Sequence, residues 1–203
     1  MSASGQELEV KFYLPGLPAL EERLAAEGAV LVQSRIHEVN LRFDTPLEEL
    51  SRTFRVLRLR QDTQARVTYK GPGEERDGVR LRQELEFSVS DFATAQAVFE
   101  ALGYRVVLMY EKYRTTYALG EVLVVLDEMP YGNFVEIEGP DGGSIRKAAE
   151  KVGLDWEARI LESYVFLFER LRQAQGLAFH DLSFANFAGR SISPEDLGVR
   201  RAG

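Results

Sequence analysis

Charged residues stand at every second position in several segments of this chain. Two segments carry a Glu-x-Glu pair, Glu7 with Glu9 and Glu136 with Glu138, and Lys11 follows the first pair. Alternate residues of a β-strand share one face, so each pair would lie on one side of a strand. Neighbouring carboxylates repel one another unless a cation lies among them, and hard divalent cations bind carboxylate oxygens. The recurrence therefore favours a metal site over a solvated strand face.

Basic residues follow the same alternation and indicate an anionic ligand. They are Lys11, Arg58, Arg60, Lys70, Arg82, Lys112 and Arg114. Guanidinium groups bind phosphate through two hydrogen bonds at once, whereas lysine acts as a point charge. If these side chains converge on one cavity, they can hold a chain of phosphates. The alternative is structural ion pairing with neighbours such as Glu84 and Glu86, and both roles are compatible in a cavity that must be balanced when empty.

Several further residues have more than one interpretation. Asp127 follows an apolar run, where it either extends the carboxylate cluster or caps a turn. His37 and His180 are far apart in the sequence, so surface or partly buried roles are expected for them rather than general-base catalysis. Ser163 and Tyr164 fall in an expected helix, in which packing of Tyr164 in the core is the default interpretation.

Composition limits the class of protein. The 203-residue chain has a formal net charge of −7, which argues against a nucleic-acid surface. No apolar run approaches the roughly 20 residues that span a bilayer, and the first residues lack the features of a signal peptide. There are no cysteines, so disulfides and thiolate metal sites are excluded. We expect a cytoplasmic monomer or homodimer whose partner is a small anionic molecule, with no nucleic acid and no membrane.

Residue patterns predict eight strands and four helices. The strands are expected over residues 6–14, 29–43, 52–61, 66–70, 79–89, 104–119, 121–127 and 133–138. The helices are expected over residues 18–28, 91–102, 144–152 and 155–175. Residues 1–5 are expected to be flexible, residues 6–175 to form one domain, and residues 176–203 to form an extended tail that packs on the body.

The charged strand faces decide the expected fold class. Unpaired charge is too costly to bury in a dry core, so these faces must line a polar space. Eight mostly antiparallel strands satisfy this requirement by closing into a barrel with a watery lumen, while their apolar faces point outward beneath helices. The expected fold is therefore α+β, an eight-stranded antiparallel β-barrel with flanking α-helices.

The order of these motifs resembles the CYTH family, also called triphosphate tunnel metalloenzymes. The family's Glu-x-Glu-x-Lys signature is matched by Glu7, Glu9 and Lys11, and its closing Ser-Tyr by Ser163 and Tyr164. The intervening motifs are matched in order by Arg58 and Arg60, Lys70, Arg82 with Glu84 and Glu86, Lys112 and Arg114, Asp127, and Glu136 and Glu138.

The resemblance implies a tunnel in which basic residues bind a triphosphate and glutamates hold Mg²⁺ or Mn²⁺. It makes Glu7, Glu9 and Glu138 the first metal candidates, with Glu136 and Asp127 next. The residues that it places in catalysis are Glu7, Glu9, Lys11, Arg58 and Glu138. Further lumen positions are Glu84, Glu86 and Ser163.

The resemblance also implies an activity on triphosphates. The leading expectation is metal-dependent hydrolysis of inorganic triphosphate, thiamine triphosphate or a nucleoside triphosphate. Residues 43–72 look most like the class IV adenylate cyclase branch, which converts ATP to cyclic AMP and pyrophosphate. Members with cyclase activity tend to carry His-Phe shortly before the first motif, whereas residues 1–6 here are Met-Ser-Ala-Ser-Gly-Gln. Cyclisation is therefore the second expectation, and non-catalytic binding of polyphosphate or nucleotide is the third.

Overall fold

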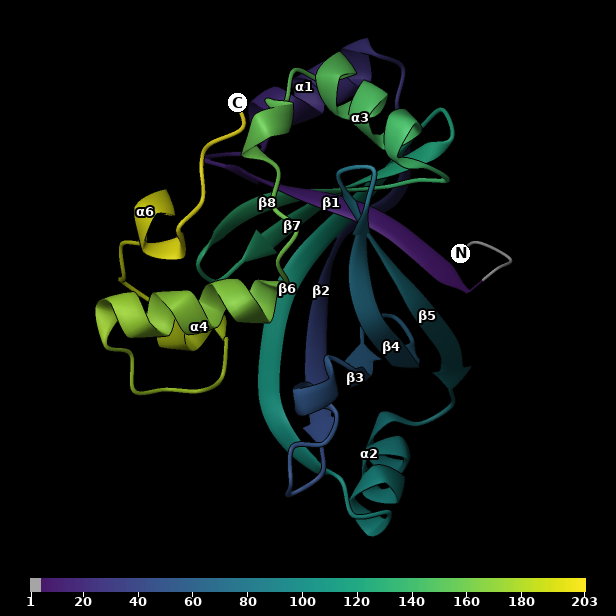
Figure 1. Ribbon diagram of the computed structural model, residues 1–203, viewed down its shortest axis with the longest axis vertical. Helices are drawn as coiled ribbons and strands as arrows, with labels where there is room; N and C mark the ends of the chain where they lie inside the picture. Colours follow the sequence, from purple (N-terminus) through teal and green to yellow (C-terminus); the bar gives the residue numbers. More distant parts are fainter. Residues whose placement is uncertain (1–4) are drawn as a thin grey trace.

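A computed structural model describes residues 5–203, and within them eight antiparallel strands close into one barrel (Figure 1). Around the ring the strand order is β1-β5-β4-β3-β2-β6-β7-β8. The strands are β1 (Gln6–Leu14), β2 (Val30–Asp44), β3 (Val56–Gln61), β4 (Ala65–Arg76), β5 (Val79–Val89), β6 (Arg105–Leu119), β7 (Val122–Met129) and β8 (Gly132–Glu138). The expected fold class is confirmed.

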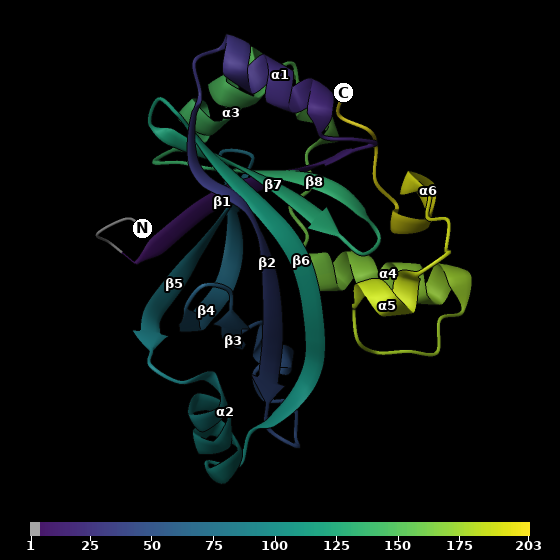
Figure 2. The same ribbon diagram turned by 180° about the vertical axis from the view of Figure 1, so that it is seen from behind.

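Helices cover the barrel at both ends and on one side (Figure 2). The α-helices are α1 (Pro18–Ala26), α2 (Phe92–Ala101), α3 (Gly142–Lys151), α4 (Tyr164–Gln175), α5 (Phe184–Phe187) and α6 (Pro194–Leu197), and two short 3₁₀ segments are η1 (Ser51–Thr53) and η2 (Trp156–Ala158). Helices α1 and α3 lie together at one end, α2 lies at the other, and α4 to α6 lie beside the barrel. In the part of the chain that is described, no helix is long and apolar enough to cross a membrane.

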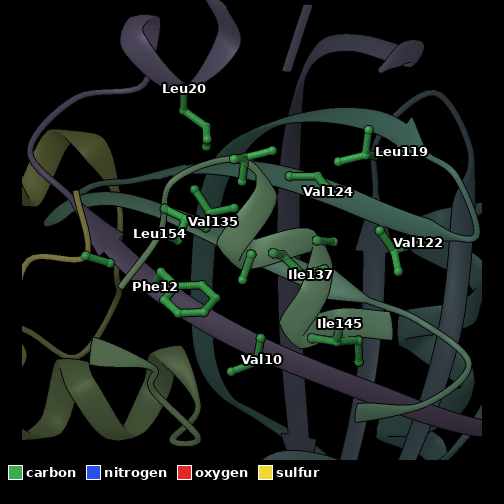
Figure 3. Packing of buried hydrophobic residues seen from close by; sticks show 14 of the residues in the cluster. Val10, Phe12, Leu20, Leu119, Val122, Val124, Val135, Ile137, Ile145 and Leu154 are labelled. Carbon is green, nitrogen blue, oxygen red and sulfur yellow. The ribbon is translucent and has the colours of Figure 1, made fainter. Parts of the chain in front are cut away.

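Apolar strand residues point outward and over much of the barrel pack beneath helices, whereas Leu85 and Phe87 of β5 are exposed. Val10 and Phe12 of β1 are fully buried in one cluster with Leu20 of α1 and Ile145 of α3 (Figure 3). Burying a side chain of this size contributes roughly 1.5–3 kcal/mol. Because successive strand residues alternate in direction, this outer packing fixes Glu9 and Lys11 on the inner face.

The structure corrects two expectations about the C-terminal third. The helix expected over residues 155–175 is interrupted, since η2 ends at Ala158 and α4 begins only at Tyr164. Between them, Ile160 pairs with Lys11: its N–H donates to the Lys11 carbonyl at 2.8 Å and its carbonyl accepts from the Lys11 N–H at 3.1 Å. The helix does not form here because this backbone hydrogen-bonds to strand β1 of the barrel. The interruption places Tyr164 at the lumen.

Residues 176–203 were expected to be extended, yet they include α5 and α6. Ser183 and Ser193 begin these helices, because each hydroxyl accepts a backbone N–H three residues on. The segment packs on the body, with Leu182 donating its N–H to the Met109 carbonyl at 2.9 Å. The expected flexible stretch over residues 1–5 falls, apart from Gly5, outside the described residues.

Candidate active site in the barrel lumen

The lumen holds a cavity of about 800 Å³ to which all eight strands contribute side chains. Every residue of the predicted site lines it except Asp127: the carboxylates Glu7, Glu9, Glu84, Glu86, Glu136 and Glu138, the basic residues Lys11, Arg58, Arg60, Lys70, Arg82, Lys112 and Arg114, and Ser163. The alternation that the sequence displays therefore places these side chains in one space.

Three carboxylates gather where β1 meets β8. Glu9 lies opposite Glu138 in the antiparallel register, and oxygens of Glu7, Glu9 and Glu138 all lie within 4.8 Å of one another. Among residues 5–203, the Glu138 carboxylate has neither a hydrogen bond nor an ion pair. Burial, together with the nearby charges of Glu7, Glu136 and Glu9, raises the pKa of Glu138 to about 7, although Arg114 opposes the shift.

These three carboxylates fit a divalent cation. Burial also raises the pKa of Glu7, with a further contribution from Glu84 and against the attraction of Lys70. Burial is the largest cause of both shifts, and at Glu138 the neighbouring carboxylates add to it with no described basic side chain in contact, so a cation bound there would offset their charge. Oxygen donors in such a group suit Mg²⁺ or Mn²⁺ rather than a thiolate-preferring metal. Glu7, Glu9 and Glu138 are thus the residues that would hold the ion.

Glu136 is placed differently from this group. Its carboxylate lies 3.2 Å from Lys11 Nζ and 2.5 Å from Arg114 Nη2. Burial acts to raise its pKa, but Lys11 and Arg114 outweigh that effect and hold the pKa well below its usual range. Glu136 therefore serves to hold two basic side chains in the ionised lumen.

Asp127 lies behind the cavity wall and caps no turn. Its side chain is fully buried and accepts hydrogen bonds from Lys112 at 2.9 Å, Arg114 at 2.7 and 2.6 Å and the Tyr164 hydroxyl at 2.9 Å. Both carboxylate oxygens of Asp127 accept hydrogen bonds, so Asp127 does not join the carboxylates of Glu7, Glu9 and Glu138. Tyr164 is not only a packing residue, because its hydroxyl reaches this ion-pair network from α4.

Strand β2 contributes three inward residues that sequence reasoning missed, Glu38, Asn40 and Arg42. Glu38 lies 3.7 Å from Lys112 and 3.5 Å from Arg60. Burial opposes ionisation of Glu38, but these cations and Arg114 lower its pKa to about 2. The signal was present, because the three polar residues alternate with Val39, Leu41 and Phe43.

Three arginines that line the cavity have no carboxylate within ion-pair distance among the described residues. Arg82 donates to the Gly71 carbonyl at 2.9 Å and Arg80 to the Leu161 carbonyl at 3.2 Å, and the third is Arg42. Burial lowers the pKa of both Arg42 and Arg82, reinforced for Arg82 by the neighbouring Arg80. Arg82 is buried and Arg42 and Arg80 are half-buried, and cations without counterions in such a space suit an anionic ligand.

The remaining basic residues are engaged by carboxylates. Lys70 lies 2.6 Å from Glu7 and 2.7 Å from Glu84, and Lys11 lies 2.7 Å from Glu9. Within residues 5–203, nine basic and seven acidic side chains line the cavity. Glu38 and Asp127, which pair with Arg60, Lys112 and Arg114, bring the number of acidic side chains to nine, so the described basic and acidic groups of the lumen are equal in number.

The two histidines lie outside this arrangement. His37 Nε2 lies 2.8 Å from the carboxylate of Glu111, which also accepts the Phe184 N–H at 3.0 Å. His37 thus belongs to the contact between β2, β6 and the C-terminal segment. Neither His37 nor His180 lines the cavity, in line with the minor roles expected for them.

The structure is thus that of an antiparallel, tunnel-like barrel with a charged lumen, in which three arginines and Glu138 lack an ion-pair partner among the described residues. The CYTH domain model matches residues 5–156, and the chain belongs to the CYTH domain family. A search of curated proteins finds no significant match to the sequence.

Solved structures with this architecture come from distant organisms. A protein of Pyrococcus horikoshii shares 25% identity at a TM-score of 0.66, covering 78% of this chain and 96% of that chain. A candidate adenylate cyclase of Vibrio parahaemolyticus shares 21% identity at a TM-score of 0.70, covering 78% of this chain and 94% of that chain. A candidate adenylyl cyclase of Hippeastrum shares 18% identity at a TM-score of 0.60, covering 80% of this chain and 95% of that chain. Its structure is described as revealing a dominant triphosphatase activity.

Proposed function

We propose that the chain is a divalent-metal-dependent hydrolase of a triphosphate substrate. The observation that carries this proposal is the coexistence, in one lumen, of arginines without a carboxylate partner and of a group of three carboxylates in which Glu138 has no cation partner among the described residues. The first group suits a polyanion, and the second suits a divalent cation that accompanies phosphates. The activity described for the Hippeastrum protein is consistent with it.

The chain's own residues would bind and orient the phosphates. Arg82, which is buried, and Arg42, which is half-buried, are cations available to phosphate oxygens, and Arg58 is held in place by the Thr68 hydroxyl at 3.0 Å. Fixed positive groups around the transferred phosphoryl group stabilise the charge that spreads over its oxygens. The barrel supplies these groups from different strands, so they need no reorganisation during the reaction.

A cation bound by Glu7, Glu9 and Glu138 would neutralise phosphate oxygens and lower the pKa of a bound water. Lys11 contacts both Glu9 and Glu136, at 2.7 and 3.2 Å, so it is positioned beside this group. Lys11 is then able to shift its hydrogen bonds from carboxylate to phosphate when substrate arrives.

The test is a substrate panel of tripolyphosphate, thiamine triphosphate and ATP, each with Mg²⁺, Mn²⁺ or EDTA. We expect phosphate release that requires a divalent cation. The variant Glu9→Gln should lose activity by on the order of 100-fold, because it removes a charged metal ligand while keeping the side-chain shape.

Glu128→Gln provides the matched control. Glu128 pairs with Arg35 and does not line the cavity, so the variant should keep full activity. Absence of phosphate release from all three substrates contradicts the proposal. Formation of cyclic AMP and pyrophosphate from ATP would instead assign the chain a cyclase reaction.

A further inference from the structure

A second cavity of about 360 Å³ adjoins the lumen, a size at the lower end of ligand pockets. Arg80 and Ser163 line both cavities, so the two spaces meet at these residues. The second cavity differs in character, because Phe54, Leu161 and Phe166 supply apolar side chains to it. A ligand extending from the lumen would therefore pass from a charged space into an aromatic one.

Phe54, at this cavity, combines an exposed side chain with an unfavourable backbone conformation. Its side chain is 76% exposed, and its φ of 55° lies in the left-handed region that large residues rarely adopt. An exposed phenylalanine gains little from burial, and the backbone conformation adds a cost of order 1–3 kcal/mol. Strain that surrounding structure maintains is typical of ligand-binding positions.

The loop that carries Phe54 is anchored by Asp44. The carboxylate of Asp44 accepts hydrogen bonds from the N–H of Thr45, Leu50 and Ser51, at 2.8, 2.9 and 2.8 Å, and from the Ser51 hydroxyl at 2.5 Å. These bonds hold the connection between β2 and β3 in one conformation. Phe54 is thus presented at a fixed position.

Phe166 faces the same cavity from the first turn of α4. Its N–H donates to the Ser163 hydroxyl at 3.2 Å, and the residue is 53% exposed, with the Arg170 guanidinium 5.2 Å from the ring centroid. Ser163 thus links the aromatic cavity to the lumen through the start of α4. Two exposed phenylalanines on separate elements provide apolar surface for a planar group.

Three glutamates complete the lining of the second cavity, Glu74, Glu75 and Glu162. Glu74 pairs with Arg76 at 3.0 Å and Glu162 with Arg170 at 3.4 Å. Acidic groups repel phosphate, so the phosphates of a ligand belong in the lumen. Glu75 has no ion pair among the described residues, so its carboxylate is free to attract a positive charge or to accept hydrogen bonds from hydroxyl and amino groups. The cavity therefore suits a planar ring that carries positive charge or hydrogen-bond donors.

We propose that Phe54 and Phe166 form a specificity subsite for the planar organic end of a triphosphate ester, whose phosphates lie in the lumen. This inference rests on the proposed function, and it assigns the substrate to the organic triphosphates rather than to inorganic triphosphate. The shared chemistry is a flat ring bearing positive charge or hydrogen-bond donors. A thiazolium ring and a purine nucleoside are two sources of it.

The test compares Phe54→Ala and Phe166→Ala with the unchanged chain on thiamine triphosphate, ATP and tripolyphosphate. Loss of ring stacking should raise KM for at least one organic triphosphate roughly tenfold and leave kcat and tripolyphosphate hydrolysis unchanged. Phe54→Trp should restore the low KM. Leu102→Ala removes an equally exposed side chain at the end of α2, remote from both cavities, and serves as the control.

Calorimetric binding in EDTA separates failure of this inference from failure of the hydrolase proposal. If the chain hydrolyses nothing, dissociation constants replace KM, and the phenylalanine variants should still weaken binding of the organic triphosphate alone. A larger effect with thiamine triphosphate identifies the cationic ring, and a larger effect with ATP identifies the donor-bearing ring. Equal effects on all three ligands, or no effect on any, overturn the assignment.

Discussion

Replacing Glu138 by glutamine should stabilise the metal-free protein above pH 7 and not in acid. The pKa of Glu138 is about 7 in the folded protein, against 4.5 for an ordinary glutamate, because of burial and of the charges of Glu7, Glu136 and Glu9. Between these two values the folded state retains a proton that the unfolded chain has released. Stability therefore falls as pH rises from about 4.5 through about 7.

The magnitude follows from the two pKa values. At roughly 1.4 kcal/mol per pH unit, the difference between 4.5 and about 7 corresponds to about 3 kcal/mol. Glu138→Gln keeps the shape and removes the titration. The variant should thus exceed the unchanged chain in stability by about 3 kcal/mol at pH 8.5 and by less than about 1 kcal/mol at pH 5.

Urea denaturation in EDTA at the two pH values measures this difference, with Glu128→Gln as the control that should change neither value. Repeating the series with Mg²⁺ tests the metal site without any activity assay. A divalent cation favours the charged carboxylate, so Mg²⁺ should stabilise the unchanged chain at pH 8.5 and have a smaller effect on Glu138→Gln. A stability difference that is equal at pH 5 and pH 8.5 would refute the reasoning.

Two further predictions concern residues that hold the site in place. Asp127→Ala should lower stability by about 3–5 kcal/mol in urea denaturation, because it leaves the buried cations Lys112 and Arg114 without this partner; a loss below about 1 kcal/mol would show that the network does not need Asp127. Asp44→Ala should lower stability by about 2 kcal/mol and speed hydrogen exchange of the Leu50 and Ser51 amides, which lose their buried acceptor; unchanged exchange would contradict its anchoring role.

The alternation of charge was sufficient to predict the barrel and most of its lining. Strand residues alternate strictly between two faces, so Glu7, Glu9 and Lys11 had to share a side once β1 formed. Their charge made that side polar, and the apolar residues between them supplied the outer core. The same alternation applies to Glu38, Asn40 and Arg42 of β2. They were not predicted as site residues because an acid, an amide and a base in alternation do not repeat one residue type as the glutamate pairs do.

The interruption before α4 and the position of Asp127 depend on contacts that the sequence does not display. Residues 155–175 have an amphipathic pattern, but the backbone at Ile160 bonds to Lys11 of β1 and leaves the helical path. Asp127 follows an apolar run on β7, and only the pairing of Arg114 with Asp127 across β6 and β7 gives it a role in holding cations. Local sequence patterns predict which residues form helices and strands. The register between strands that are distant in the sequence decides which charged side chains pair, and local patterns do not predict it.

The pairing of charged side chains within the lumen also decides which charges remain available to a ligand. Arg58 and Arg82 have the same sequence context, each within an alternating charged strand, yet Arg58 lies 3.6 Å from Glu86 while Arg82 has no carboxylate partner in residues 5–203. In the register Glu7 lies opposite Arg82, but its carboxylate is bonded to Lys70 instead. Since ion pairs inside the lumen cancel in charge, the residues left over include Arg82 among the cations and Glu138 among the acids, and these are the places at which we propose that phosphate and metal bind.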